Sequence, residues 1–338
     1  MNIAVIGLGF MGSTHLKALR NVPSARVAAV VSSDERKLTG DLTGIQGNLG
    51  GPGERMDFSA LKRYRRPEEA LADPEIEAVD ICLPTHLHAP LVLAALRAGK
   101  HVLVEKPLAL DGASADELVA EARRSGRVLM TGQVLRFVPS YRIGAEMVKS
   151  GNFGRVRSAL FRRRCAAPAW GGWHSDPSKS GGGVFDLLIH DVDYCLHLLG
   201  APDAVSAVGF ENLPAGVDWI AARFHYRDAG PVLVTGGWHH PKAYPFSMEF
   251  TVVSDGGTFE YSSAGRPLTL YTAAGESQHL DRATPDLFQA ELDYFIECAS
   301  QGRRPDLCPP EESAAAVKLA KWMLESRSRN GEEIPCRL

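Results

Sequence analysis

Three short segments of this sequence contain residues whose types and spacing could carry chemistry. The first is Gly7-x-Gly9-x-x-Gly12, which lies between an apolar run at 3–6 and a helical pattern at 13–21. Glycines at this spacing permit a tight turn and a close approach of the backbone to a pyrophosphate, which would rest on the helix N-terminus. Phe10 and Met11, inside the motif, are predicted to bind the cofactor as well. Because the motif stands between a strand and a helix, it predicts a dinucleotide site rather than a merely structural turn.

The choice of dinucleotide depends on the residues that end the second predicted strand. An acidic residue there would hold the hydroxyls of the adenosine ribose and repel a 2′-phosphate. Ser32 occupies the position where the acid is expected. Asp34 could still reach the ribose, whereas Ser33 together with Arg36 and Lys37 could cradle a phosphate. The sequence leaves NAD and NADP open, with a slight preference for NAD.

The second segment is Glu105-Lys106-Pro107, directly after the apolar run at 101–104. Ligands of parallel sheets bind beyond the carboxyl ends of the strands, so Lys106 is predicted to point into a binding cleft. There it could polarise a substrate oxygen or hold a shared proton, although an ordinary surface lysine is the alternative. Glu105 and three residues that follow the preceding strand are predicted to border the cofactor: Pro84, Thr85 and His88.

The third segment begins with three glycines at 181–183 and continues into an apolar helical pattern that carries Asp186, His190 and Asp193. Residues four apart share one face of a helix, so Asp186 and His190 are predicted to lie side by side. Such a pair could transfer protons, because histidine titrates near neutrality. A helix-surface or helix-capping pair is the commoner alternative. A metal site is not expected, because no third ligand is specified nearby.

The elements that hold these segments are predicted from hydrophobic periodicity. In residues 1–131, continuous apolar runs, typical of strands that are covered on both faces, alternate with helical patterns. The predicted strands are 3–6, 27–31, 79–83, 101–104 and 128–131, and the predicted helices are 13–21, 88–98 and 113–124. This alternation predicts a doubly wound parallel sheet of the Rossmann type. A glycine-rich stretch at 38–57 has no clear period and is predicted to be a long, irregular loop.

The pattern changes after residue 131. Short alternating runs between 203 and 272, separated by Gly, Pro and Asp, predict antiparallel strands. The other predicted elements are helices at 139–149, 183–199, 285–300 and 310–327, a strand at 155–164 and a loop at 166–182. The sequence therefore predicts two domains, a dinucleotide-binding domain at 1–131 and an α/β domain at 132–338.

The bulk composition limits the classes of function. The 338 residues carry 37 basic and 40 acidic side chains, for a net charge of −3, without a long run of either sign. A nucleic-acid-binding protein usually shows a basic stripe, so nucleic acid and anionic membranes are poor matches. The six cysteines lack metal-knuckle or redox-motif spacing and are expected to be reduced. A strand that starts by the third residue and the absence of a membrane-length apolar run predict a soluble, cytoplasmic protein.

Taken in this order, the three segments resemble those of the Gfo/Idh/MocA family of oxidoreductases. The glycine motif is generic, but Glu105-Lys106-Pro107 followed by Gly-Gly-Gly-x-x-Asp186-x-x-x-His190 is specific. Thr85 and His88 are similar to the family's Thr-x-x-His turn, and Gly132-Gln133-x-x-Arg136-Phe137-x-Pro139 resembles its domain junction. The resemblance covers essentially the whole chain.

The resemblance implies a Rossmann domain joined to an α/β domain with a large, open, mostly antiparallel sheet, through which homodimers or homotetramers form. It also implies hydride transfer between a nicotinamide and a carbinol carbon of a sugar, inositol or related polyol. By resemblance, His190 would remove the hydroxyl proton, Lys106 would stabilise the alkoxide, and Asp186 would orient the lysine or the substrate. Which of Lys106 and His190 is the principal base varies among relatives.

The substrate side of the site is predicted from the segment at 169–174, in which Trp173 and His174 would line the pocket, and from Arg136. The two tryptophans of this segment can equally be hydrophobic plugs. Two other functions stay open: a catalytically silent regulator that senses nucleotides, and a lyase or glycosidase that uses tightly held NAD. A regulator would be expected to lack the lysine or the Asp/His pair, and this sequence retains Lys106, Asp186 and His190.

Overall fold

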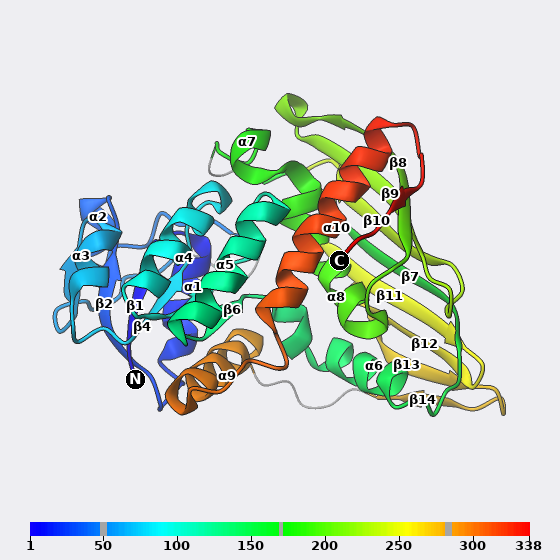
Figure 1. Cartoon of the computed structure of the whole chain (residues 1–338), viewed down its shortest axis with the longest axis horizontal. Coiled ribbons are helices and arrows are strands. Elements are labelled where there is room, and N and C mark those ends of the chain that lie inside the picture. The colour runs from blue at the N-terminus through cyan, green and yellow to red at the C-terminus, as the bar shows by residue number, and fades with distance from the viewer. Residues whose placement is uncertain (48–52, 169–171, 281–285) are drawn as a thin grey trace. The chain divides into compact units, whose positions relative to one another are not determined.

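The computed structural model describes residues 1–47, 53–168, 172–280 and 286–338 (Figure 1). The chain forms two compact units, residues 1–134 with 285–314, and residues 135–284 with 315–338. The sequence prediction assigned the whole of 132–338 to one domain. In the structure, α9 (Leu287–Gln301) instead packs on α1 (Phe10–Leu19) of the first unit. Local periodicity predicts that α9 is a helix but carries no information on which unit it joins.

The first unit is built on a parallel six-stranded sheet in the order β3-β2-β1-β4-β5-β6. This order confirms the doubly wound Rossmann sheet predicted from the sequence. The strands are β1 (Asn2–Ile6), β2 (Arg26–Val31), β3 (Lys62–Tyr64), β4 (Ala78–Ile81), β5 (His101–Val104) and β6 (Leu129–Thr131). Every residue of β4 and β5 is buried, as expected for central strands of a sheet covered on both faces.

Helices accompany these strands in the first unit. Besides α1 and α9, they are α2 (Glu35–Leu38), α3 (Pro67–Ala72), η1 (Thr85–Leu87), α4 (His88–Arg97) and α5 (Gly112–Ser125). Helix α1 begins three residues before the predicted position, because the last glycine of the first motif lies inside the helix rather than ahead of it.

The stretch at 38–57 is more regular than predicted. In its described part, the backbone N–H of Leu42 donates to Glu54 O at 3.2 Å, and that of Met56 donates to Gly40 O at 2.9 Å. The side chains of Leu42 and Met56 are buried. The two ends of this stretch therefore pair with each other through backbone hydrogen bonds. The buried side chains of Leu42 and Met56 attach the stretch to the first unit.

The second unit contains a nine-stranded sheet in the order β14-β13-β12-β11-β7-β10-β9-β8-β15. Only β7 and β10 pair in parallel among the described strands of this sheet, which confirms the predicted large, mostly antiparallel sheet. The strands are β7 (Val156–Cys165), β8 (Ala204–Asn212), β9 (Val217–His225), β10 (Val232–Trp238), β11 (Ser247–Ser254), β12 (Gly257–Ser262), β13 (Arg266–Thr272), β14 (Ser277–His279) and β15 (Ile334–Pro335).

One face of this large sheet is covered by helices and the other is open (Figure 1). Tyr194 of α8 (Ile189–Leu199) packs edge-on against Phe161 of β7. Tyr141 of α6 (Pro139–Lys149) packs against Phe250 of β11, and these contacts build the core of the unit. On the opposite face Val208 and Leu233 are exposed. The remaining helices are η2 (Val134–Phe137), α6 (Pro139–Lys149), α7 (Pro177–Ser180), η3 (Val184–Leu188), α8 (Ile189–Leu199), η4 (Leu213–Ala215) and α10 (Pro310–Ser328).

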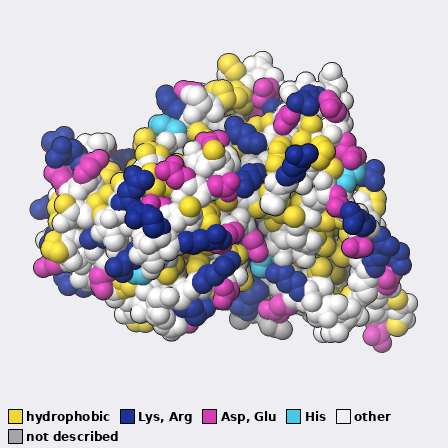
Figure 2. All heavy atoms as spheres, viewed as in Figure 1, with side chains coloured by type: hydrophobic (Ala, Val, Ile, Leu, Met, Phe, Trp, Pro, Cys, Tyr) yellow, Lys and Arg dark blue, Asp and Glu magenta, His cyan; other side chains and the backbone are white. Residues whose placement is uncertain are grey.

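The surface carries both signs of charge. Figure 2 shows Lys and Arg side chains interspersed with Asp and Glu across the visible face. Within the described residues, no helix combines the length and apolarity needed to cross a membrane.

Candidate functional site

The glycine turn after β1 is shaped by close backbone contacts. Gly7 has a φ of +101°, and a Cβ there would lie 2.4 Å from the carbonyl oxygen of Cys82. A Cβ on Gly12 would lie 1.9 Å from the carbonyl oxygen of Gly7. Both positions therefore need glycine for packing. Gly9 differs, because a Cβ there would meet no atom of the described chain within 4 Å.

The space in front of Gly9 suits an anion. Gly9 is the N-cap of α1, and no side chain of the described residues caps the helix there. The first N–H groups of a helix lack intrahelical partners and carry a partial positive charge. Phe10 and Met11 contribute the first of these groups. The turn therefore has the open volume and the donors that the pyrophosphate of a dinucleotide requires.

The residues that follow β2 are held by one another. Asp34 caps α2, accepting from the backbone N–H of Arg36 at 2.9 Å, and Ser32 Oγ accepts from the N–H of Asp34 at 3.2 Å. Ser33 and Asp34 are exposed. The guanidinium of Arg36 is paired with Asp41, with Nε 2.9 Å from Oδ2. Hydrogen bonds from Thr43 and Arg36 lower the pKa of Asp41 far below its usual value.

The turn after β4 holds Pro84, Thr85 and His88. Thr85 begins η1 and is buried. His88 is also buried, with Nδ1 2.7 Å from the carbonyl oxygen of Pro107 and Nε2 2.7 Å from that of Leu83. Both ring nitrogens are therefore occupied by backbone groups. The ring of His88 thus holds two turns together. The prediction that His88 belongs to a turn beside the cofactor is not tested by these contacts.

Lys106 follows β5 at the carboxyl end of the parallel sheet and is partly exposed. That it points into a binding cleft is still a prediction. Its neighbour Glu105 is buried and accepts the backbone N–H of Lys106 at 3.1 Å. The other oxygen of Glu105 lies 3.3 Å from Nε2 of His15. The peptide bond between Lys106 and Pro107 is cis.

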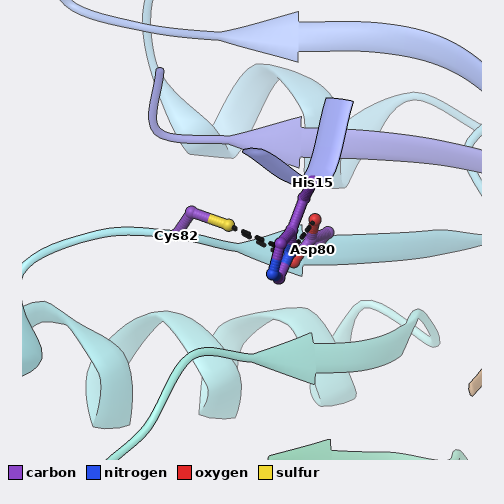
Figure 3. Close-up of side chains that lie close together, drawn as sticks. All are labelled: His15, Asp80 and Cys82. Carbon is purple, nitrogen blue, oxygen red and sulfur yellow. Dashed lines mark hydrogen bonds and ion pairs between the residues drawn. The ribbon is translucent and has the colours of Figure 1, made fainter. Parts of the chain in front are cut away.

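Sequence reasoning missed the buried group behind this turn, which includes His15 and Asp80. His15 lies one turn after the glycine motif, and Nδ1 lies 2.9 Å from Asp80 Oδ2 (Figure 3). A signal was present, because a carboxylate in the middle of an apolar strand needs a partner.

In the second unit, the triple glycine permits a tight approach to η3. Gly181 and Gly182 have φ values of +74° and +78°, and a Cβ on either would lie 2.6 Å from a neighbouring side-chain atom. The N–H of Gly183 donates to Asp218 Oδ2 of β9 at 2.6 Å. Asp218 is itself paired with Arg327 of α10. The start of the helical segment is thus fastened to the sheet.

Asp186 and His190 lie on this fastened segment. The sequence predicted a continuous α-helix over 183–199, but residues 184–188 form a π-helical turn before α8 begins at Ile189. Such turns are frequent at functional sites. Asp186 and His190 are each partly exposed, while the residues between them are buried. The two side chains are therefore the accessible polar groups of this turn.

Two buried ion pairs are formed by residues that directly follow His190 in α8. Asp191 pairs with Arg163 of β7 at 2.6 Å, and Asp193 pairs with Arg136 at 2.6 Å. Arg136 was predicted to contact substrate. Its exposed fraction is 1%, and its Nε and one terminal nitrogen both bind Asp193, so this prediction is corrected. Arg136 anchors α8, because a buried guanidinium needs a paired carboxylate.

The predicted substrate segment is only partly described, because 169–171 lie outside the described residues. Trp173 and His174 are partly exposed, and their rings stack at 3.9 Å between centroids. The backbone carbonyl of His174 accepts from Ser180 Oγ at 2.7 Å, which ties the segment to α7.

The predicted site residues thus fall into two groups. The glycine turn, Asp34 and Lys106 belong to the first unit, where they follow β1, β2 and β5 of the parallel sheet. Asp186, His190, Trp173 and His174 belong to the second unit.

Comparison with known proteins gives matches in both units. Residues 1–133 match a model described as an oxidoreductase family with an NAD-binding Rossmann fold, and residues 141–260 match a GFO/IDH/MocA C-terminal domain.

Among curated proteins, a myo-inositol 2-dehydrogenase of Thermotoga maritima is 31% identical over 203 residues, which are 59% of this chain and 55% of that protein. A scyllo-inositol 2-dehydrogenase (NAD(+)) of Bacillus subtilis is 28% identical over 321 residues, 89% of this chain and 87% of that protein. The chain spans about half the length of the first two curated relatives that it matches.

Solved structures share the fold over the whole chain. A levoglucosan dehydrogenase in complex with NADH and levoglucosan superposes with a TM-score of 0.84 over 100% of both chains. At 18% sequence identity this likeness concerns the fold alone.

Proposed function

Because the chain belongs to the Gfo/Idh/MocA family of oxidoreductases, we propose that it transfers a hydride between a nicotinamide dinucleotide and a carbinol carbon of a sugar, inositol or related polyol. The observation that carries the proposal is the open space at Gly9. There, an uncapped helix N-terminus meets a glycine turn whose other two glycines are fully packed. This is the cradle that a pyrophosphate fills.

In this proposal, the two groups of site residues act on one substrate. His190 accepts the hydroxyl proton, because an imidazole exchanges protons near neutral pH. Lys106 stabilises the negative charge that develops on the oxygen, and Asp186 orients the hydroxyl or the lysine. The bound nicotinamide supplies the hydride acceptor, and the reverse reaction uses the same groups.

We further propose NAD rather than NADP as the cofactor. Support comes from Arg36, one of the two cations expected to cradle a 2′-phosphate, because Asp41 already pairs with its guanidinium. The exposed carboxylate of Asp34 adds a negative charge where a 2′-phosphate would lie. Both features disfavour a phosphate.

The cofactor proposal is tested by competition binding of NAD and NADP to the wild type and to Asp41→Ala. NAD should bind more tightly to the wild type. The variant should gain affinity for NADP, most clearly at low salt, because Arg36 is released from its partner. Tighter NADP binding by the wild type would contradict the proposal.

The substrate class is tested by a spectrophotometric screen of polyols and sugars with each cofactor. Reduction of the nicotinamide by at least one inositol, sugar or anhydrosugar is expected, in line with the substrates named for the relatives. A chain that binds the dinucleotide but oxidises no such compound would point to the regulator or lyase alternatives.

We also propose that the partner of the open sheet face is a second copy of this chain. Val208, Phe210 and Leu233 are exposed there, with exposed fractions of 52%, 55% and 41%. Nearby Arg162 and Glu249 provide both signs of charge, which suits a self-complementary surface.

A reducing, cytoplasmic location accords with six cysteines that form no disulfide in the described chain.

A further inference from the structure

A buried group of ionisable side chains lies beneath the glycine turn of the first unit. It consists of His15 on α1, Asp80 on β4, Glu105 after β5 and Glu291 on α9. The exposed fractions are 0% for His15, Asp80 and Glu291 and 7% for Glu105. All four side chains are buried, so each charge among them needs a partner inside the protein.

His15 stands between two carboxylates. Its Nδ1 lies 2.9 Å from Asp80 Oδ2, and its Nε2 lies 3.3 Å from Glu105 Oε1. A neutral imidazole can donate from only one nitrogen, so two carboxylate neighbours favour the doubly protonated ring. Burial is the largest single influence and lowers the pKa of His15, but the electrostatic and hydrogen-bond contributions of Asp80 and Cys82 together raise that pKa well above the usual value.

Glu291 is favoured as a neutral acid. Burial raises its pKa well above the ordinary value, and the charges of Glu105 and Asp80 act in the same direction. Neither of its carboxyl oxygens has a hydrogen-bond partner among the described residues. A neutral Glu291 adds no further negative charge to the group around His15.

A metal ion is the alternative occupant, because His15, Asp80 and Cys82 converge (Figure 3). Two tetrahedral zinc ligands at about 2.0–2.2 Å from the ion would lie about 3.3 Å apart. The observed 2.9 Å between His15 Nδ1 and Asp80 Oδ2 is a hydrogen-bond distance instead. Burial also raises the pKa of the Cys82 thiol, which keeps its proton and donates to Asp80. The geometry favours a protonated ring over a metal.

This group is connected to Lys106 by its backbone. Glu105 uses one oxygen for His15 and the other for the N–H of Lys106, 3.1 Å away. On the other side of Lys106, the carbonyl of Pro107 lies 2.7 Å from Nδ1 of His88. The residues before and after Lys106 are therefore each held by a buried imidazole.

We propose that His15 is a positioning residue for Lys106, acting through the carboxylate of Glu105. The imidazolium is a counter-ion for this buried carboxylate, 3.3 Å from Glu105 Oε1. The backbone of Lys106 is held by Glu105 on one side and by the contact of His88 with Pro107 on the other. This inference rests on the proposed role of Lys106 in hydride transfer.

The first test does not depend on activity. In His15→Asn, Glu105 loses its counter-ion, so hydrogen exchange of the Lys106 amide should accelerate at least tenfold. His101→Asn is the matched control. His101 is buried at the opposite end of β5 and accepts the N–H of Val128, so its loss should leave the Lys106 amide unchanged. Unchanged exchange in a folded His15→Asn would overturn the proposal.

Glu105→Gln provides a second variant in case His15→Asn does not fold. It keeps an acceptor for the Lys106 amide but removes one of the two charges beside His15. Nitrogen-15 NMR of the histidine rings should show His15 protonated at both nitrogens at pH 7.5 in the wild type, with a lower apparent pKa in Glu105→Gln. A singly protonated ring in the wild type would also overturn the proposal.

The second test uses turnover with the best substrate of the polyol screen. Misplacing a catalytic group by about 1 Å can cost about 100-fold in rate, so His15→Asn should lower kcat by about 10- to 100-fold, with the Kd for NAD within about threefold. In a Glu105→Ala background the same change should have little further effect, because His15 acts through Glu105. Additive losses would indicate a merely structural role. A wild type without any turnover would refute the proposed function and leave the exchange and NMR results to decide the inference.

Discussion

At the scale of single residues, the glycines of the first motif divide into two kinds. Gly7 and Gly12 are required by the protein itself, since a Cβ on either would overlap a backbone atom. Gly9 is not, because the space in front of it contains no atom of the described chain within 4 Å. Because the fold itself does not require glycine at position 9, we attribute the glycine there to dinucleotide binding. Substitutions at Gly9 and Gly12 should therefore differ in their effects on dinucleotide affinity and on stability.

Gly9→Val should therefore abolish dinucleotide binding and leave the thermal unfolding midpoint nearly unchanged. Gly12→Val is the matched control and should destabilise the folded protein, because its side chain meets the carbonyl of Gly7. Calorimetric titration with NAD and NADP, together with thermal unfolding, checks both variants. Unchanged dinucleotide affinity in Gly9→Val would remove the basis of the cofactor assignment.

Lys106→Ala and His190→Ala should each lower turnover by about 10²- to 10⁴-fold, the usual worth of general acid–base assistance. Cofactor affinity should stay nearly intact, because neither side chain is assigned to the pyrophosphate or the ribose. The two residues are proposed to act on one proton, so the double variant should lose less than the product of the single losses. Steady-state kinetics on the best substrate is the measurement, and full activity of His190→Ala would contradict the assignment.

At the scale of elements, the helix that follows the Asp186–His190 segment is held by buried charge. Asp191 and Asp193 are both buried on α8, and each pairs with an arginine from another element. A buried pair adds little net stability, but removing one partner leaves an uncompensated charge. These pairs therefore fix the position of α8. A variant that removes one partner of a pair is expected to lose a large part of the free energy of unfolding.

Arg163→Met should lower the free energy of unfolding by about 3–5 kcal/mol, because Asp191 is left buried without its partner. Arg162→Met is the control on the same strand. Its pair with Glu249 is partly exposed, and such pairs contribute about 0–1 kcal/mol. Urea unfolding of both variants gives the comparison. Equal losses would show that the buried pair has no special role.

The contact between β3 and the C-terminal end of α3 is expected to make an acid-sensitive contribution to stability. Hydrogen bonds from Lys62, Glu75 and Tyr64 lower the pKa of Asp73 to about 2. Because the folded-state pKa is below the unfolded one, this stabilisation is present at neutral pH and is lost as the pH falls through about 2. Asp73→Asn should therefore flatten the loss of unfolding free energy between pH 4 and pH 2, roughly the range that separates the two pKa values. An unchanged slope would exclude this contribution.

At the scale of the whole molecule, the second unit has one helix-covered sheet face and one open face. Alternation along β10 buries Val232 and Val234 but exposes Leu233. Exposed apolar residues on several adjacent strands are unusual for a monomer and mark an interaction surface. The second copy proposed for this surface would bury them.

Leu233→Glu combined with Phe210→Glu should convert a dimer or tetramer into monomers, because both charges would be buried without partners in the interface. Light scattering after size-exclusion chromatography gives the mass. Leu338→Glu is the control, since Leu338 is equally exposed at 45% but lies off the sheet. A wild type that is already monomeric would refute the proposed self-association.

The sequence by itself determined the features that depend on near neighbours in the chain. The glycine turn, the Lys106 segment at a strand end and the parallel sheet all follow from local spacing and from apolar runs that must be buried on both faces. The family resemblance and the class of chemistry followed from the same short motifs. The identity of the proposed catalytic residues is still a prediction from those motifs.

Only the tertiary structure decided which polar residues face inward. Arg136 and Asp193 are 57 residues apart, and His15 and Asp80 are 65 apart. His88 and Pro107 are brought together in the same way. A sequence shows that an arginine or a histidine is present, but burial of its charge depends on a partner that the fold brings from far along the chain. For that reason Arg136 was predicted as a ligand contact, and the group around His15 was not predicted at all.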